Sequence, residues 1–238
     1  MIVSIHQPGY LPWYGLFHRL ALSDLHIFFD SAQFEKNGFN NRVKVKTSQG
    51  GQWLTVPVLM KGRFGQSPIS QTQINNNVNW RDSHWKTLLY NYSRAPYFKA
   101  NSEFFRDLFS KEWLRLGDLN MYAVEQISAM LGIRCRFIKA SQLNASGQKA
   151  ELVLNLCKAA GASTYVSGIN GRDYLNYADF KAAGIELRYQ AFREPGYRQL
   201  HGEFAAFMSI ADLLFNRGPE SCETMMSGQA SLADGTVS

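Results

Sequence analysis

A short loop near the N-terminus concentrates side chains that could bind and transform a small molecule. The segment 6–13 reads HQPGYLPW. Histidine is the most frequent general base in enzymes, and a loop rich in glycine and proline can turn backbone N–H groups toward an anion at the start of a helix. We therefore expect His6 to be catalytic and Gln7, Tyr10 and Trp13 to bind substrate. The structural alternative is that His6 bonds a buried backbone group while the prolines only set the turn.

A second set of polar residues follows the apolar stretch that ends at Phe29. Asp30 could orient His6 or receive a proton, and we expect it to be catalytic. Lys36 and Arg42 could hold an anionic substrate, arginine through its planar fork of donors. The other expected substrate-binding residues of this segment are Gln33 and Asn41. The alternative is an aspartate that ends a strand, followed by solvated charges.

A third candidate segment, SGINGRDYL, begins at Ser167. Ser167, Gly168 and Gly171 follow an apolar strand-like stretch and could form a loop whose backbone cradles a phosphate. The spacing matches neither the P-loop nor the dinucleotide fingerprint, and no GxSxG nucleophile elbow occurs. Near the C-terminus, Asp212 interrupts an apolar stretch, and a buried carboxylate requires a partner. We expect Asp212 to cap a helix or to form an ion pair.

The elements that must position these residues alternate between strands and helices. Apolar spacing predicts a strand at 2–5, a helix at 13–22 and a strand at 25–29. This is the length of a βαβ unit, in which the two strands are parallel neighbours. His6 and Asp30 would then lie at one edge of the sheet, outside the carboxyl ends of the strands, where open α/β sheets bind ligands.

The middle of the chain interrupts this alternation, which returns after it. Alternating residues at 42–46 and 52–58 flank Gly50 and Gly51 and predict a β-hairpin. Later periodicities predict a strand at 134–138, a helix at 147–160, a strand at 164–167, a helix at 178–183, a strand at 186–190 and a final helix at 204–215. We therefore predict one α/β domain over residues 1–220, with a mostly parallel open sheet flanked by helices. The hairpin and a mainly helical segment at about 80–131 are insertions, and residues 221–238 form a flexible tail.

Composition narrows the class of protein. The chain has 238 residues, of which 45% are hydrophobic, and this is enough to build a core and to exclude intrinsic disorder. No apolar run reaches the length of about 18 residues that suggests a membrane span, and the N-terminus lacks the pattern of a signal peptide. The three cysteines are far apart and form no CxxC pair, which favours a reduced, cytoplasmic protein. No HxxxH or HxH spacing occurs, so we expect no metal site.

The net charge of +6 is spread along the whole chain. Proteins that bind nucleic acids usually concentrate positive charge in blocks. The diffuse excess fits an anionic small-molecule substrate at least as well as a polyanion, and it argues against a nucleic acid as the partner.

Taken together, these residues resemble the WbqC-like protein family over roughly residues 2–220. The resemblance rests on His6-Gln7-Pro8, Tyr10, Pro12-Trp13, Gly15, Phe17, Asp30, Gln33-Phe34, Asn41-Arg42, Trp53 to Pro57, Tyr165, Ser167-Gly168, Gly171, Tyr174-Leu175, Gly184-Ile185, Ser209, Asp212 to Asn216 and Gly218. It implies a role in bacterial surface-polysaccharide pathways, including O-antigen assembly and amino-sugar modification. It brings no agreed catalytic residue, so the site residues above remain inferences from the sequence.

A weaker similarity links the opening of the chain to nucleotidyltransferase (HUP-like) folds of the pantothenate synthetase type. The two-histidine HxGH signature of those enzymes is absent here, which argues against adenylation but is compatible with such an α/β fold. Our leading hypothesis is a cytoplasmic transferase that modifies a nucleotide-activated amino sugar by forming an amide. The alternatives are an ATP-dependent carboxylate-activating ligase and a non-catalytic binding protein of a glycan pathway. The cofactor is left open, and a homo-oligomer is compatible with the sequence.

Overall fold

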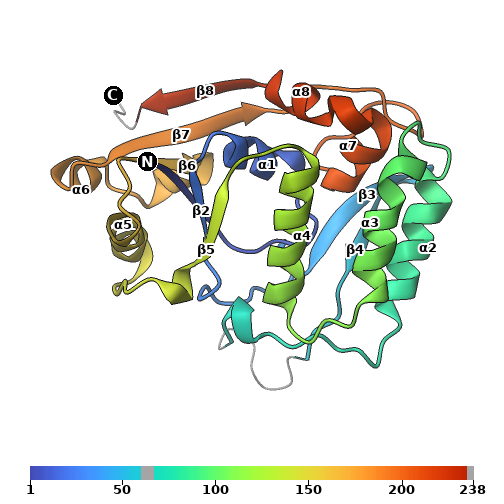
Figure 1. Ribbon diagram of the computed structural model, residues 1–238, viewed down its shortest axis with the longest axis horizontal. Helices are drawn as coiled ribbons and strands as arrows, with labels where there is room; N and C mark the ends of the chain where they lie inside the picture. The colour runs from blue at the N-terminus through green and yellow to red at the C-terminus, as the bar shows by residue number, and fades with distance from the viewer. Residues whose placement is uncertain (60–66, 235–238) are drawn as a thin grey trace.

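A six-stranded sheet forms the centre of the molecule (Figure 1). The structure is a computed structural model that describes residues 1–59 and 67–234. The strands of this sheet, in their spatial order, are β5 (Arg136–Lys139), β2 (Leu25–Phe28), β1 (Ile2–His6), β6 (Thr164–Gly168), β7 (Glu186–Arg193) and β8 (Gln229–Asp234). The first five are parallel to one another, and β8 is antiparallel to β7. This confirms the predicted mostly parallel α/β sheet.

The order of the parallel strands creates a switch point between β1 and β6. From β1 the chain proceeds to β2 and β5 on one side, and it then returns to β6 and β7 on the other side. In open α/β sheets, ligands bind outside the carboxyl ends of the strands at the place where this order reverses. The strand order therefore singles out the ends of β1 and β6.

Helices cover both faces of the sheet (Figure 1). They are α1 (Tyr14–Ala21), α2 (Trp80–Tyr92), α3 (Phe98–Ser110), α4 (Leu116–Met130), α5 (Lys149–Ala159), α6 (Tyr177–Ala182), α7 (Ile210–Arg217) and α8 (Ser221–Met226), and the short 3-10 helices are η1 (Ile69–Gln71), η2 (Ala140–Gln142), η3 (Ile169–Asp173) and η4 (Gly218–Glu220). The predicted hairpin is present as β3 (Arg42–Thr47) and β4 (Gly50–Thr55). The helical insertion corresponds to α2, α3 and α4.

Two apolar cores lie on opposite faces of the sheet. Because side chains alternate along a strand, Val3 and Ile5 face one side, where they pack with α5 and α6. Ser4 and His6 face the other side, which is covered by α1. The larger core joins α1 to α4, α7 and the hairpin. Among the described residues, no helix is long and apolar enough to cross a membrane.

The structure differs from the predictions near the C-terminus. Helix α7 begins at Ile210, after Ser209 caps it by accepting a hydrogen bond from the N–H of Ala211, so the predicted helix at 204–215 starts six residues too early. The expected tail carries helix α8 and strand β8 as far as Asp234, and residues 235–238 lie outside the described residues. Strand β8 pairs through its backbone with the otherwise open edge of β7, and this pairing needs no apolar side-chain pattern.

Candidate functional site

His6 and Gly168 lie at the switch point of the sheet. His6 is the last residue of β1, and Gly168 is the last residue of β6. The two strands are parallel neighbours, with Ser4 opposite Val166. The same register, continued by two residues, puts His6 level with Gly168. Helix α1 covers this face, because Gln190 of β7 donates hydrogen bonds to Gly15 O and to His18 on that helix.

The geometry of His6 suits a general base. Its Nδ1 lies 2.8 Å from the carbonyl oxygen of Gln7. A carbonyl only accepts, so Nδ1 carries the ring proton and Nε2 keeps its lone pair. His6 reaches the molecular surface, but the protein atoms packed around its ring keep water from part of it. This desolvation, followed by the charge of Arg19, lowers the pKa of His6 to about 4. At neutral pH His6 is therefore an uncharged imidazole with a free acceptor.

The loop that follows His6 is held from two directions. Asn120 of α4 donates from Nδ2 to the carbonyls of Pro8 and Asn40, at 3.1 and 2.7 Å. Asn40 in turn donates to Gln7 Oε1 and to Pro8 O. Together these bonds fix the backbone on which the imidazole is mounted, as a catalytic side chain requires.

The far end of the same loop is fixed by the start of α7. Ser209 donates from Oγ to Leu11 O, its backbone N–H donates to Lys44 O of the hairpin, and the N–H of Ile210 donates to Pro12 O. The β1–α1 loop is thereby tied to both the hairpin and the C-terminal helices.

Arg19 of α1 is the residue of this site that the sequence analysis missed. Its side chain is buried, with 6% of its surface exposed, and its Nε has no hydrogen-bond partner. Among the described residues, no carboxylate forms an ion pair with it. A Cβ placed on Gly168 would lie 3.1 Å from Arg19 Nη1, so the guanidinium reaches the end of β6. The only distinguishing feature of Arg19 in the sequence is that it is a charged residue within the mostly apolar helical segment 13–22.

Buried polar side chains fill the layer between α1 and the sheet, where open sheets usually carry apolar ones. His26 bonds Ser4 Oγ through Nδ1 at 2.9 Å, and its Nε2 is buried without a partner. Burial, and then the charges of His6 and Arg19, lower the pKa of His26 well below 6.5. Burial and Arg19 lower the pKa of His18 to about 4. The layer thus contains one cation and three neutral imidazoles.

The segment after β6 is packed tightly behind Gly168. Ser167 is buried and its Oγ donates to Gly168 O at 3.1 Å, and Gly171 is also buried. Gly168 remains partly exposed. Of the three residues expected to cradle a phosphate, Gly168 is therefore the one whose backbone is open to a ligand.

Replacing Gly171 with alanine tests whether this packing sets the shape of the loop. The added Cβ would lie 2.1 Å from Ser167 Oγ and 3.0 Å from Leu175 Cδ1. We expect Gly171→Ala to lower the free energy of unfolding by about 1–3 kcal/mol through overpacking. Urea unfolding measures the change, and Gly196→Ala, whose Cβ would come no closer than 4.0 Å to Phe204, measures the effect of an added methyl group without crowding. A Gly171→Ala variant as stable as wild type would show that the loop adjusts.

Asp30 lies at the end of β2, as predicted, but it is buried and does not contact His6. Its carboxylate accepts from the N–H and the Oγ of Ser141, at 3.0 and 2.7 Å. Asp30 was expected to be exposed at the edge of the sheet, but only 1% of its surface is exposed. Its hydrogen bonds anchor η2 to the end of β2, a structural role, and we leave it out of the proposed catalytic group.

The other residues of the second predicted set are spread along the loop and the hairpin. Asn41 is buried and donates to Val56 O at 2.9 Å, which closes the open end of the hairpin. Arg42 lies over the Trp53 ring, 4.3 Å from its centroid, and donates to Asn37 O. Lys36 and Gln33 are exposed. The hydrogen bonds of Asn41 and Arg42 thus go to Val56 and Asn37 and not to His6.

The aromatic residues of the β1–α1 loop divide into one buried and one partly exposed ring. Tyr10 has no exposed surface, and its hydroxyl bonds His84 Nδ1 at 2.8 Å, so it belongs to the core. Trp13 is partly exposed and packs against Phe192 and Phe207, with ring centroids 5.7 and 5.2 Å away. Trp13 therefore remains a candidate for contact with a ligand, whereas Tyr10 does not.

Asp212 organises a second buried polar network. Tyr92 and Tyr197 donate to its two carboxylate oxygens at 2.8 and 2.7 Å, and Asn216 also donates to it. Burial raises the pKa of this carboxyl in spite of these hydrogen bonds. Tyr92 in turn accepts from the backbone N–H of Lys46. The network joins α2, α7 and the hairpin, so the expected capping or ion pairing is replaced by tyrosine donors.

Glu194, just after β7, is a carboxyl group whose pKa the fold raises. Its Oε1 is buried without a partner, while Oε2 accepts from the N–H of Phe207 at 2.8 Å. Burial raises its pKa to about 7.

The pKa of Glu194 predicts a pH dependence of stability. A raised pKa means that Glu194 binds its proton more tightly in the folded state than in the unfolded state. Protonation of Glu194 therefore adds fully to the free energy of unfolding below pH 4.5, and this gain is lost as the pH rises to about 7. We expect Glu194→Gln to be more stable than wild type at pH 8 by about 1–2 kcal/mol, after allowance for its partial exposure, and equally stable at pH 4.5. Urea unfolding of both proteins at the two pH values measures the difference. A difference independent of pH would contradict the assignment.

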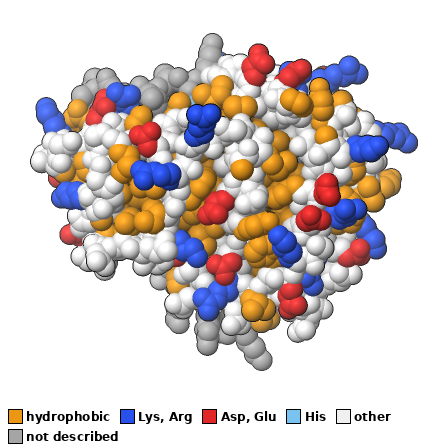
Figure 2. All heavy atoms as spheres, viewed as in Figure 1, with side chains coloured by type: hydrophobic (Ala, Val, Ile, Leu, Met, Phe, Trp, Pro, Cys, Tyr) orange, Lys and Arg blue, Asp and Glu red, His pale blue; other side chains and the backbone are white. Residues whose placement is uncertain are grey.

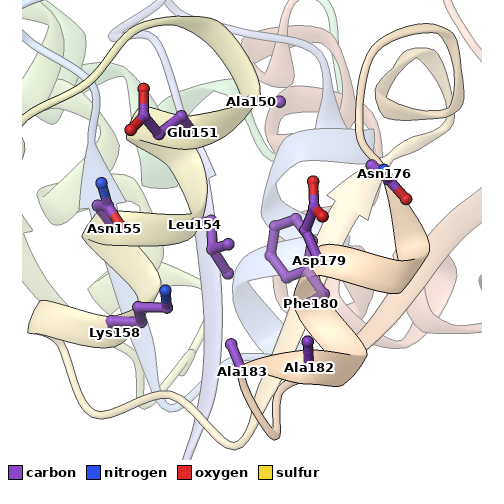
Figure 3. Close-up of a pocket in the computed structure, with 10 residues that line it drawn as sticks. All are labelled: Ala150, Glu151, Leu154, Asn155, Lys158, Asn176, Asp179, Phe180, Ala182 and Ala183. Atoms are coloured by element: carbon purple, nitrogen blue, oxygen red, sulfur yellow. The ribbon is translucent and has the colours of Figure 1, made fainter.

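A groove of about 420 Å³ lies on the opposite face, between α5 and α6 (Figure 3). Leu154 and Phe180 project into it, and Glu151, Lys158 and Asp179 line it. It contains none of the switch-point residues. Within residues 1–59 and 67–234, no group of three or more His, Cys, Asp or Glu side chains is placed to hold a metal ion. The groove and the switch point are therefore separate places in the fold, and the histidines and the buried arginine lie at the switch point.

The surface charge is mixed where it can be seen. On the face shown in Figure 2, lysine and arginine side chains alternate with aspartate and glutamate, and apolar side chains lie between them. Positive charge is not gathered into a patch on this face.

The fold and the site together define an open-sheet α/β protein whose polar groups gather at the switch point. The sequence matches the WbqC-like protein family over residues 7–224, and the chain belongs to this family. It is also 38% identical, over 223 residues, to the uncharacterized protein Rv1507c of Mycobacterium tuberculosis (strain ATCC 25618 / H37Rv). That alignment covers 92% of this chain and 95% of the relative. No solved structure matches the chain.

Proposed function

We propose that the protein is a cytoplasmic transferase that modifies a nucleotide-activated amino sugar by forming an amide, in the biosynthesis of a bacterial surface polysaccharide. The observation that carries the proposal is His6, an exposed, uncharged imidazole with a free Nε2 at the switch point of the sheet. Membership of the WbqC-like family is consistent with such a pathway.

The proposed reaction joins the amino group of the sugar to an activated acyl donor. The amine nitrogen attacks the acyl carbonyl carbon, and a C–N bond forms while the bond from that carbon to the leaving group breaks. His6 Nε2 accepts the proton that the nitrogen loses and returns it to the departing group. Trp13 and the backbone of Gly168 lie on elements that border this position and contact the substrate.

A thermal-shift screen tests the proposal. The panel contains uridine and thymidine diphosphate amino sugars, acyl-coenzyme A, and ATP with Mg²⁺. A ligand at 100 times its dissociation constant stabilises a protein by about 2.7 kcal/mol, so a bound nucleotide sugar raises the melting temperature measurably. We expect a shift with a nucleotide amino sugar and amide formation when an acyl donor is added. A shift with ATP alone would favour the carboxylate-activating ligase, and no shift with any small molecule would favour a binding protein for a carrier-linked partner.

A further inference from the structure

We propose that Arg19 binds a phosphoryl group of the substrate at the point where β1 and β6 end. The basis is a buried arginine that no carboxylate within residues 1–59 and 67–234 neutralises. Its side chain is 94% buried, its Nε lacks a hydrogen-bond partner, and no described carboxylate pairs with it. A buried charge is costly unless it is paired, so folds retain one where a ligand supplies the counter-charge.

The fold aims this side chain at the switch point. Helix α1 starts at the carboxyl end of β1 and runs back along the sheet, and side chains on a helix lean toward its N-terminus. Arg19 therefore extends back toward the ends of the strands, where Nη1 reaches the position that a side chain on Gly168 would occupy. Because residue 168 is glycine and partly exposed, a ligand oxygen can approach the guanidinium there.

The groups around Arg19 favour an anion and provide no competitor for it. The titratable groups that interact electrostatically with the Arg19 guanidinium are His6, His18, His26, Tyr165 and Tyr174. None of these is a carboxylate, and the three imidazoles are neutral at pH 7, so the site has a net charge of about +1. A phosphoryl group presents two oxygens to the planar guanidinium and matches its paired donors.

The inference deepens the proposed function, and it rests on that function for the identity of the substrate. A phosphoryl group could come from a nucleotide sugar or from free phosphate, which have the same chemistry at Arg19. Titration calorimetry at low ionic strength separates these sources with four probes: inorganic phosphate, pyrophosphate, uridine diphosphate and uridine. Acetate serves as a carboxylate comparison. We expect the phosphorylated probes to bind and uridine and acetate not to bind, with uridine diphosphate the tightest if the nucleotide itself is recognised.

Two variants and a matched control assign the binding to Arg19. Arg19→Met removes the charge but keeps an unbranched chain in the core, and we expect phosphate-probe binding to weaken about 10- to 100-fold, the loss of charge-assisted hydrogen bonds. The melting temperature should stay the same or rise, because an unpaired buried charge is removed. Gly168→Ala keeps the charge and fills the approach to Nη1, and it should weaken binding without unfolding. Arg136→Met removes an exposed arginine at the opposite end of the sheet and should change neither property.

The outcomes are distinguishable from those of the transferase assay. Equal binding of phosphate to wild type and Arg19→Met, or no binding of any phosphorylated probe to wild type, would overturn the inference. If Arg19→Met fails to fold, unchanged binding in Gly168→Ala would overturn it instead. Phosphate binding that depends on Arg19, without amide formation from any amino sugar, would keep the anion site and remove the proposed reaction.

Discussion

Replacing His6 with alanine is expected to lower turnover by about 10²–10⁴-fold, the usual contribution of a positioned general base. The imidazole is exposed and makes one hydrogen bond, to the carbonyl of its own neighbour Gln7. Its removal therefore takes little from the packing, and the melting temperature should remain close to that of wild type. Steady-state kinetics with the nucleotide amino sugar found in the screen measure the loss.

The matched control for this substitution is His201→Ala. His201 is also exposed and also bonds one backbone carbonyl, that of Asn91 at 2.9 Å, but it lies in the loop before α7. It should retain full turnover. If His6→Ala kept its turnover, or lost it only in proportion to the fraction unfolded, the catalytic role of His6 would be wrong.

The pH dependence of turnover gives an independent check on His6. In the free protein its pKa of about 4 makes it unprotonated but a weak base at neutral pH. The positive charge of Arg19 is one of the two causes that lower the pKa of His6. An anion bound at Arg19 would neutralise that charge and raise the pKa of His6 again. The acid limb of kcat should therefore lie at a higher pH than the limb of kcat/KM, which reports the free enzyme.

Replacing Asp212 with alanine is expected to cost about 3–5 kcal/mol of the free energy of unfolding. The substitution leaves the hydroxyls of Tyr92 and Tyr197 buried without their acceptor and opens a cavity between them. Each unsatisfied hydroxyl costs about 1–3 kcal/mol, and breaking a buried charged network by removing one member costs about 3–5 kcal/mol. Chemical denaturation monitored by tryptophan fluorescence measures the change.

Asp212→Asn is the control that separates hydrogen bonding from volume. It keeps the shape and one acceptor oxygen, so one tyrosine retains a partner, and the loss should be roughly half as large. A loss below about 1 kcal/mol in Asp212→Ala would mean that water replaces the carboxylate and that the network is not buried as described.

The parts of the fold that follow from local periodicity could be predicted from the sequence. Alternation between strand-like and helical stretches located β1, α1 and β2, and it correctly placed His6 at the carboxyl edge of a parallel sheet. The start of α7 was predicted too early because Phe204 and Phe207 fit a helical spacing. Both rings are instead exposed on a loop, at 37% and 64%, and the capping hydroxyl of Ser209 decides where the helix begins.

The contacts that define the candidate site could not be predicted, because each joins distant parts of the chain. In the sequence, Arg19 has the features of a surface residue on a short helix. The fold instead places it next to Gly168 at the end of β6. Asp30 looks like a partner for His6 until Ser141, 111 residues later, takes both of its oxygens. Hydrophobic spacing specifies which face of an element is buried, but it does not specify which polar groups meet there.

The hydrogen bonds at Ser209 imply an order of events during synthesis. The loop that carries His6 is held at Leu11 by a residue 198 positions further along the chain. The ribosome must therefore have made the chain as far as Ser209 before this bond can form, and contacts of such long range form late in folding. A nascent chain that stops short of α7 can form β1 and α1, but the far end of its β1–α1 loop lacks the hydrogen bonds from Ser209 and Ile210. We therefore expect substrate binding only after the chain has been made as far as α7.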